Sequence, residues 1–129
     1  MKSGLLAAWL AGLLLWVACG AQAHEVRPGV LELREGQPGN YSLLWKRPAG
    51  GEVDIRMAPV LPAECRAATP GATLLTPGAL VVRGTITCEG GLRGRTIVID
   101  GLASTVTDVL VRVYHADGWQ ETHLLKPMN

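Results

Sequence analysis

The sequence predicts an all-β protein, an antiparallel β-sandwich of about seven strands that follows an N-terminal export signal. Two observations lead to this fold class. Short segments after residue 23 alternate apolar and polar residues, as strands with one buried face do. Gly and Pro separate these segments, because all 8 Pro and most of the 16 Gly lie after residue 23. No segment there has the period of an amphipathic helix.

The first 23 residues have the three-part pattern of a secretory signal peptide. Lys2 supplies a positive start, an apolar run of 15 residues extends from Leu5 to Cys19, and Ala21-Gln22-Ala23 ends it with small residues. The run is shorter than the roughly 20 apolar residues that a membrane-spanning helix needs. We therefore expect cleavage after Ala23 and a periplasmic or secreted mature chain that begins at His24. An uncleaved signal anchor and lipid attachment at Cys19 are the alternatives.

Residues 24–129 have the composition of one small globular domain. Of these 106 residues, 45 are hydrophobic, and 11 Lys and Arg balance 11 Asp and Glu. Nucleic-acid-binding domains and polybasic membrane-surface proteins usually have an excess or a cluster of basic residues, and this segment has neither. We expect a single β-sandwich domain with no membrane span in the mature chain and no nucleic-acid partner.

The first strands are expected close to the start of this domain. Residues 31–34, Leu-Glu-Leu-Arg, alternate apolar and polar side chains and predict the first strand. A turn over residues 36–40, Gly-Gln-Pro-Gly-Asn, leads into a second strand with Tyr41, Leu43 and Trp45 on one face. This alternation predicts that Trp45 is a core residue.

A third strand is expected over residues 53–57, where Val, Ile and Met alternate with Asp and Arg. Pro59 and Pro62 are expected to end it, because Pro cannot donate a ladder hydrogen bond. Residues 67–78 are rich in Ala, Thr, Pro and Gly and predict a loop.

The second half of the domain continues the same pattern. Further strands are expected over residues 80–88, 97–99, 109–113 and 119–125. The segment 109–113 has the clearest two-residue period, and a turn at Asp117-Gly118 separates the last two strands. Residues 102–107 are expected to form one helical turn or a crossing connection.

Cleavage after Ala23 leaves two cysteines, Cys65 and Cys88, in an oxidising compartment. A disulfide between them would close a loop of 24 residues and stabilise the fold by about 3 kcal/mol. A redox or metal-binding pair is the alternative, but the Cys-x-x-Cys spacing is absent. A true immunoglobulin domain has a Trp between its paired cysteines, and this sequence has none there. The sandwich is therefore expected to be immunoglobulin-like in architecture only.

The sequence carries no motif of a known catalytic site, so we predict that the protein is not an enzyme. It has no Gly-x-Ser-x-Gly, no His-Glu-x-x-His and no phosphate-binding Gly-rich loop that opens a helix. The only serines after residue 23 are Ser42 and Ser104, and neither has a histidine beside it in sequence. An enzyme whose site is built on the loops is the third hypothesis that we keep.

A metal site is the one chemical feature that the histidines suggest. If His24 is the mature N-terminus, its α-amine and imidazole can chelate one Cu(II) or Ni(II) ion through two nitrogens. His115 and His123 flank the Asp117-Gly118 turn on neighbouring strands, so they are candidates for further ligands. The alternative is that His24 belongs to a frayed terminus and that the other two histidines face solvent.

A contact surface is the other candidate. Trp119 lies beside a turn among polar neighbours and is a candidate for an exposed aromatic contact residue. Arg93 and Arg95 belong to the same candidate surface. Together with Arg112 they are expected in loops or on outward strand faces, where charge discourages edge-to-edge pairing.

Several short segments are distinctive in combination. They are His24–Gly29 followed by Leu31–Leu33, then Leu44–Lys46, Leu61–Cys65, Gly91–Ile97, Asp100–Leu102 and Thr107–Val113. These segments resemble the exported N-terminal region of HupE/UreJ-type membrane proteins, over essentially all of residues 24–129. The family takes its name from accessory proteins of nickel enzymes, so the resemblance implies a link to nickel or cobalt uptake in bacteria.

Members of that family continue into several transmembrane helices that would form a permease, whereas this sequence ends at Asn129 before any such helix. The resemblance therefore implies a non-enzymatic, periplasmic accessory or sensing domain that has an inner-membrane permease as its partner. A truncated form of a longer membrane protein is the other interpretation. The second functional hypothesis is a small copper- or nickel-binding protein that uses His24.

Overall fold

The computed structural model describes residues 3–5, 9, 12, 27–51 and 55–127. The predicted signal peptide lies largely outside these residues, and the expected cleavage site after Ala23 and the new N-terminus at His24 lie entirely outside them. Within the described ranges, no helical segment has both the length and the apolar character that a bilayer crossing requires.

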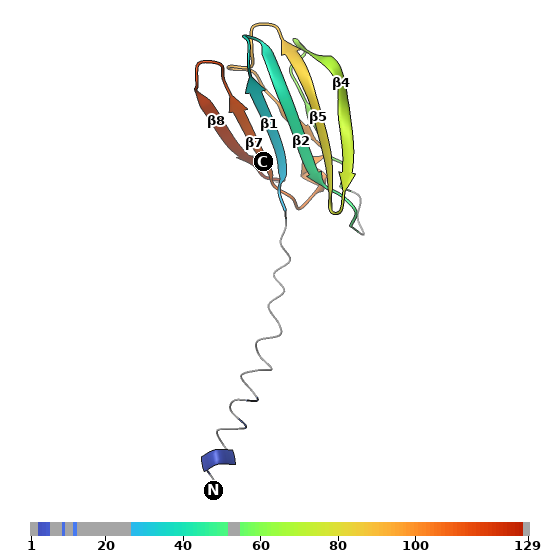
Figure 1. Cartoon of the computed structure of the whole chain (residues 1–129), viewed down its shortest axis with the longest axis vertical. Coiled ribbons are helices and arrows are strands. Elements are labelled where there is room, and N and C mark those ends of the chain that lie inside the picture. The colour runs from blue at the N-terminus through green and yellow to red at the C-terminus, as the bar shows by residue number, and fades with distance from the viewer. Residues whose placement is uncertain (1–2, 6–8, 10–11, 13–26, 52–54, 128–129) are drawn as a thin grey trace.

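Six strands form one large sheet in the order β4-β5-β2-β1-β7-β8 (Figure 1). Their bounds are β1 Gly29–Glu35, β2 Asn40–Pro48, β4 Cys65–Thr76, β5 Ala79–Cys88, β7 Val109–Tyr114 and β8 Gln120–Leu125. The pairs β1–β2, β4–β5 and β7–β8 are antiparallel hairpins. This order puts β1 and β2 in the middle of the sheet and leaves β4 and β8 at its two edges.

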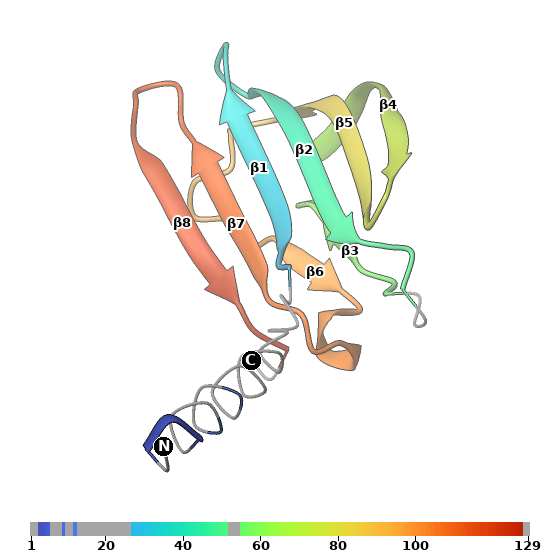
Figure 2. The ribbon, with the colours of Figure 1, turned by 60° about the horizontal axis from the view of Figure 1, so that its bottom comes forward.

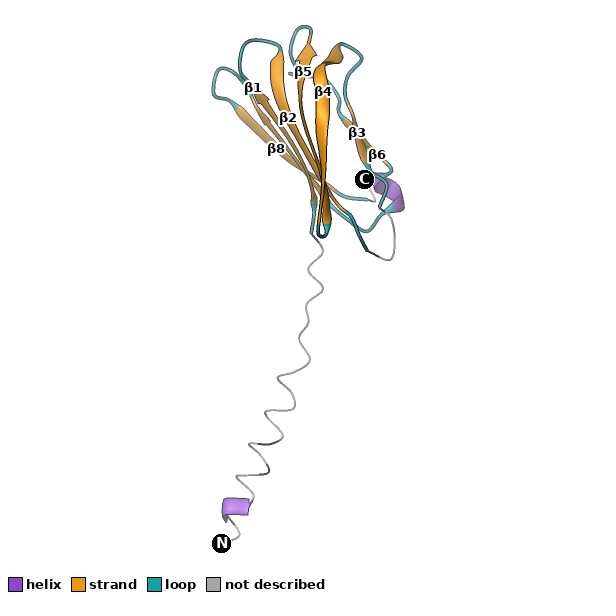
Figure 3. Cartoon of the chain, turned by 45° about the vertical axis from the view of Figure 1, so that its right-hand side comes forward, coloured by secondary structure: helices purple, strands orange, loops and turns teal. Residues whose placement is uncertain are grey.

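A second, smaller layer covers one face of the large sheet (Figure 3). It contains β3 (Ala58–Val60) and β6 (Val98–Asp100), which pair antiparallel, and the 3₁₀ turn η1 (Leu102–Ser104). The all-β prediction is therefore confirmed, and two layers enclose the core as in a sandwich. The single helical turn expected within residues 102–107 is present as η1.

The buried face of the large sheet is the one that the sequence alternation predicts. Leu31 and Leu33 are fully buried, and Trp45 is only 4% exposed, as expected for a core residue. The core consists of Leu31, Leu33, Tyr41, Trp45, Ile86, Cys88, Val109, Val111 and Val113 from the large sheet, and Met57, Leu92, Ile99 and Leu102 from the covering segments. Burying each large apolar side chain contributes about 1.5–3 kcal/mol.

The expectation that every strand pair is antiparallel is wrong for β1 and β7 (Figure 2). These strands run parallel, with Leu31 opposite Val111 and Leu33 opposite Val113. Parallel neighbours need a long crossover connection, and here the chain from β2 to η1 supplies it. The sequence pattern missed this pairing because apolar alternation is the same in a parallel strand and an antiparallel one.

The prediction of a loop over residues 67–78 is also wrong, because most of that segment belongs to the edge strand β4. The pairing of β4 with β5 shifts register twice, between Ala67 and Thr69 and between Thr69 and Ala72. These irregularities accommodate Pro70 and Gly71, which are tolerated in an edge strand. The Ala, Thr, Pro and Gly composition therefore reflects a bulged edge and not a loop.

The third strand lies later than expected. Residues 53 and 54 lie outside the described part of the chain, Ile55–Met57 precede the strand, and β3 contains Pro59 instead of ending before it. A three-residue strand in a two-stranded sheet tolerates Pro, because one of its sides needs no ladder bond. Gly101, with φ +79°, passes so close to this segment that a Cβ there would collide with the Arg56 carbonyl oxygen.

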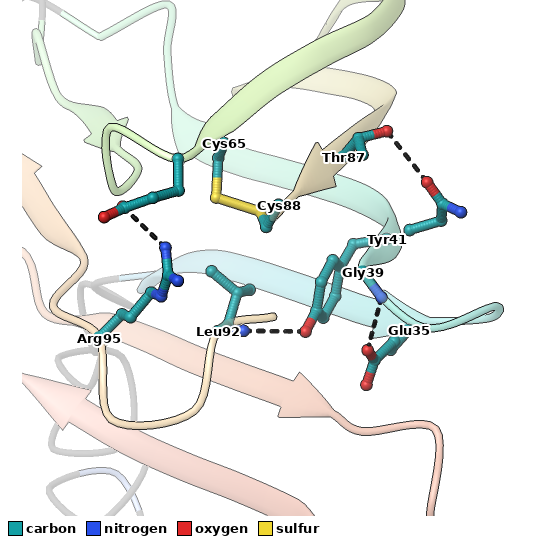
Figure 4. The surroundings of a disulfide bond; sticks show 10 residues. Glu35, Gly39, Tyr41, Cys65, Thr87, Cys88, Leu92 and Arg95 are labelled. Carbon is teal, nitrogen blue, oxygen red and sulfur yellow. Dashed lines mark hydrogen bonds and ion pairs between the residues drawn. A yellow bond between two sulfur atoms is a disulfide. The ribbon is translucent and has the colours of Figure 1, made fainter. Parts of the chain in front are cut away.

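The predicted disulfide between Cys65 and Cys88 is confirmed (Figure 4). The two residues are directly opposite each other where β4 begins and β5 ends. Cys88 is 1% exposed and belongs to the core, so the bond ties the irregular edge strand to the packed interior.

Replacing both cysteines, as Cys65→Ala with Cys88→Ala, is expected to lower the free energy of unfolding by about 3 kcal/mol, because the 24-residue loop is then open in the unfolded chain. Urea unfolding followed by tryptophan fluorescence measures the change. Cys19→Ala serves as the control, because Cys19 belongs to the predicted signal peptide and is not one of the two cysteines of the disulfide. Equal unfolding midpoints for the double variant and the unmodified chain would contradict the expectation.

Candidate functional site

The turn between β7 and β8 lies at the far end of the sheet from the start of β1 (Figure 2). The predicted contact residue Trp119 belongs to this turn and directly precedes β8. Polar side chains from three segments gather around it. We call the following residues the Trp119 cluster: Glu35, Arg93, His115, Asp117, Trp119 and Glu121. Glu35 ends β1, Arg93 lies in the connection after β5, and the other four belong to the β7–β8 hairpin.

A tight turn fixes the position of Trp119. The His115 N–H donates to the Trp119 carbonyl at 2.8 Å, and the Gly118 N–H donates to the His115 carbonyl at 3.0 Å. Gly118 has a φ of +88°, which favours glycine. The Trp119 N–H donates to Asp117 Oδ1 at 3.0 Å, so the turn predicted from Asp117-Gly118 is present.

The Trp119 ring is half-exposed and has a defined place between two partners. It stacks on the His115 ring with 5.1 Å between centroids, and the Arg93 guanidinium lies 4.9 Å from its centroid. Arg93 Nη2 also bonds Asp117 Oδ2 at 2.5 Å. The structure thus brings together the predicted contact residues Arg93 and Trp119 as an exposed cation–π pair, which His115 and Asp117 hold in place.

His115 is buried under Trp119 and lies between two carboxylates. Its Nε2 is 2.7 Å from Glu121 Oε2, and its Nδ1 is 3.9 Å from Glu35 Oε2. Only 3% of the side chain is exposed, so the alternative that His115 faces solvent is wrong. Its role in this arrangement is to support the Trp119 ring.

Glu35 connects β1 to both neighbouring turns. Its two carboxylate oxygens accept hydrogen bonds from the Gly39 N–H and the Ala116 N–H, each at 2.9 Å. Burial alone would raise the pKa of Glu35, but these two backbone hydrogen bonds and one from Tyr41 outweigh it and lower the pKa below its usual value. A charged Glu35 therefore holds the β7–β8 hairpin against β1.

Tyr41 links the Trp119 cluster to the core and to the connection after β5. Its hydroxyl accepts the Leu92 N–H at 3.1 Å, which fixes the segment that carries Arg93 (Figure 4). Burial raises the pKa of the Tyr41 phenol, and the Glu35 carboxylate adds to this effect. The phenol therefore stays neutral and can donate to Glu35.

A hollow of about 230 Å³ lies between these residues, lined in part by Glu35, Tyr41, Arg93, His115 and Asp117. Because Asp117 accepts hydrogen bonds from the Trp119 N–H and from Arg93, its pKa is lowered. The carboxylates in this hollow are therefore ionised at neutral pH, with Arg93 on its rim. An exposed aromatic ring and charges of both signs beside a hollow are suited to holding a polar or charged partner.

The other predicted contact residue, Arg95, lies apart from Trp119. Its Nη1 forms an ion pair with Glu64 Oε2 at 2.8 Å, beside the disulfide (Figure 4). Arg95 and His123 line a second hollow of about 260 Å³ with an apolar floor that includes Ile97, Val111 and Leu125. The candidate surface predicted as one group is therefore divided between two hollows.

The copper or nickel site stays a prediction. His115 and His123 both approach Glu121, at 2.7 Å and 3.9 Å, but the His115 nitrogen is already engaged there. Within the residues that the structure describes, no group of three or more His, Cys, Asp or Glu side chains is arranged to hold a metal ion. His24, the expected first ligand, lies outside those residues.

Comparison with known proteins gives no match: no protein-family model, no curated protein and no solved structure corresponds to this chain.

Sequence reasoning missed Glu35, Tyr41 and Glu121 as members of the site. Glu35 and Tyr41 belong to alternating strand patterns, and nothing in those patterns indicates that their polar atoms meet a distant hairpin. They meet it only because β1 pairs with β7. The single sequence signal was the turn at Asp117-Gly118, which marked the hairpin but not its neighbours.

Replacing Glu35 with Gln is expected to lower the free energy of unfolding at pH 7 by about 1.5–3 kcal/mol, the usual contribution of hydrogen bonds to a charged group. A carboxyl whose pKa is lowered by folding stabilises the fold above its unfolded pKa of about 4.3, and this contribution disappears as the pH falls through the folded pKa. Urea unfolding at pH 7 and pH 3 measures both effects.

The matched control is Glu32→Gln, on the same strand, whose carboxylate makes an ion pair with the exposed Arg34. Such pairs contribute about 0–1 kcal/mol, so a small effect is expected. Glu35→Gln should reduce the loss of stability between pH 7 and pH 3. An equal acid loss in the Glu35→Gln variant and the unmodified chain would show that Glu35 does not stabilise the fold in this way.

Proposed function

We propose that this protein is an exported, non-enzymatic recognition domain that works beside an inner-membrane permease in a HupE/UreJ-like system related to nickel or cobalt uptake. The sequence resemblance supports the class of system, and the signal-peptide pattern supports export. A disulfide on the sheet edge is compatible with an oxidising compartment. The observation that carries the proposal is the unequal polarity of the two ends of the large sheet.

One row of side chains crosses the outer face of the sheet close to the end where β1 begins and β8 stops. We call this set the apolar row: Val30, Leu74, Val81, Leu110 and Leu124, with Lys46 as its one charged position. Leu74 is 62% exposed and Leu124 is 52% exposed. Val106, in the connection that enters β7 at the same end, is 87% exposed. Contiguous exposed apolar residues are characteristic of contact surfaces.

Polarity increases along the outer face away from this end. The next row across the sheet is Glu32, Leu44, Ala72, Arg83, Arg112 and Thr122, and the one beyond it is Arg34, Ser42, Thr69, Thr85, Tyr114 and Gln120. The apolar row is therefore confined to one end of the sheet and is not a general property of the face. An apolar partner, such as the exposed part of a membrane protein, fits that end best.

Both described ends of the domain lie beside the apolar row. Gly29 is opposite Val109 in the sheet, and Val109 is opposite Leu125, so β1 begins and β8 stops at the same end. The Trp119 cluster lies at the opposite end, beyond Tyr114 and Gln120. In the proposed arrangement the apolar end contacts the permease, and the Trp119 cluster is available to a second, polar partner.

The structural roles of the polar groups favour recognition over catalysis. Glu35 accepts two backbone hydrogen bonds, His115 supports the Trp119 ring, and Asp117 caps the hairpin turn. These titratable groups already make hydrogen bonds or ring contacts within the domain, and each helps to hold the hairpin. A general acid or base would need a group free to exchange protons with a substrate.

Photo-crosslinking in the native host tests this proposal. A benzophenone amino acid at position 74, in the apolar row, is expected to give an ultraviolet-dependent adduct whose partner is identified by mass spectrometry as a multi-span permease of the HupE/UreJ type. The same amino acid at position 42, exposed on the polar part of the same face, is the control and should give no such adduct. No adduct at position 74, an adduct with any other protein, or equal adducts at both positions would contradict the proposal.

A further inference from the structure

The two edges of the large sheet differ in how well they are protected against pairing with another strand. The edge strand β4 pairs with β5 through two register shifts and contains Pro70 and Gly71. Bulges and Pro are the usual means by which natural sheets block edge-to-edge association. The other edge strand, β8, pairs with β7 in an unbroken register from Val109–Leu125 to Tyr114–Gln120. Among the strands that the structure describes, this regular edge is the one open to a further strand.

The register also identifies which backbone groups of β8 point to the open side. The His115 N–H donates to the Trp119 carbonyl at 2.8 Å, so His115 and Trp119 form a hydrogen-bonded pair. Such pairs alternate along an antiparallel ladder. Glu121, His123 and Leu125 therefore direct their N–H and C=O groups toward β7. It follows that Gln120, Thr122 and Leu124 direct theirs away from the sheet.

The side chains of β8 offer little to keep another strand away. The strand Gln120–Leu125 contains no Lys, Arg or Pro, and its one acidic residue, Glu121, already contacts His115. Thr122, His123 and Leu124 are exposed. An edge strand with these features is expected to recruit a partner strand.

We propose that β8 pairs antiparallel with β8 of a second copy of this chain, about a two-fold axis at Thr122. The two large sheets then join into one continuous sheet. In this register Thr122 is opposite Thr122 of the partner copy, and the outward backbone groups of Gln120 and Leu124 pair with each other across the axis. Each Glu121 is opposite His123 of the partner copy.

Side-chain complementarity selects this register. Glu121 and His123 lie on the same face of β8, since His123 follows Glu121 by two residues. A carboxylate and an imidazole that face each other across a strand pair can share a hydrogen bond. A shift of the register to an axis at His123 would place two histidines opposite each other and Glu121 opposite Leu125, so the complementary pair would be lost. The register at Thr122 satisfies both the backbone groups and these side chains.

The partner strand would also complete the second hollow. Glu121, His123 and Leu125 of β8 form one wall of the hollow of about 260 Å³ whose floor includes Val111 and Ile97. An added strand extends that wall with the same side chains from the second copy. Because a single pair of short strands buries less surface than stable protein interfaces do, the dimer is expected to be reversible and to depend on concentration.

Disulfide trapping tests the register directly. Thr122→Cys, in a Cys19→Ser background, places two thiols opposite each other across the axis, where paired strands hold Cα atoms about 5.5 Å apart and a disulfide can form. Oxidation should convert most of the exported protein into a covalent dimer on a non-reducing gel. Ser42→Cys in the same background is the control, because Ser42 is exposed on the interior strand β2 and should give little dimer. Little dimer from Thr122→Cys, or equal yields from both variants, would overturn the proposal.

Sedimentation velocity tests whether two copies associate through the outer edge of β8. Thr122→Pro removes an N–H that points away from β7, so no bond within the sheet is lost and the fold should survive. The unmodified chain and the control Thr122→Val should shift toward dimer as concentration rises, whereas Thr122→Pro should stay monomeric, with an unchanged near-ultraviolet circular dichroism spectrum. A monomer at all concentrations for the unmodified chain, or unchanged dimerisation of a folded Thr122→Pro, would overturn the proposal. If Thr122→Pro does not fold, the disulfide experiment decides the question.

Discussion

The parallel pairing of β1 with β7 is the constraint on which the rest of this structure depends. Without it, the large sheet would be two separate parts, the antiparallel strands β4-β5-β2-β1 and the hairpin β7–β8. The pairing brings Leu31 and Leu33 against Val111 and Val113, so that these two parts share one core. Because the two strands point the same way, the end of β1 lies beside the turn that follows β7. Glu35 can therefore bond the Ala116 N–H at 2.9 Å.

The candidate site follows from the same pairing. Glu35 holds the hairpin, the hairpin holds His115, and His115 supports the half-exposed ring of Trp119. Tyr41 fixes Arg93 from the other side through the Leu92 N–H. The surface that we propose for recognition is thus held in place by contacts among its own side chains and with the backbone. The opposite end of the sheet, with the apolar row, owes its uniform character to the registers of all six strands.

Local patterns in the sequence predicted the features that depend on residues close together in the chain. The alternation at residues 31–34 and 109–113 identified strands and their buried faces, the two cysteines left after the expected cleavage predicted the disulfide, and Asp117-Gly118 marked the last turn. Strand direction, the bulged β4 and the place of Pro59 were missed, because they depend on neighbours that are distant in the sequence. Part of the candidate site was missed for the same reason, because its residues are brought together by strands that are distant in the sequence. Trp119 and Arg93 were predicted one by one, whereas Glu35 and Tyr41 join them only through the pairing of β1 with β7.

The backbone nuclear Overhauser pattern between residues 29–34 and 109–114 tests this pairing most directly. The account predicts cross-peaks between facing residues whose numbers differ by 80, such as Leu31 with Val111 and Leu33 with Val113. Cross-peaks between residues whose numbers have a constant sum would mean an antiparallel pair. That result, or the absence of contacts between the two segments, would contradict the fold and the site that it builds.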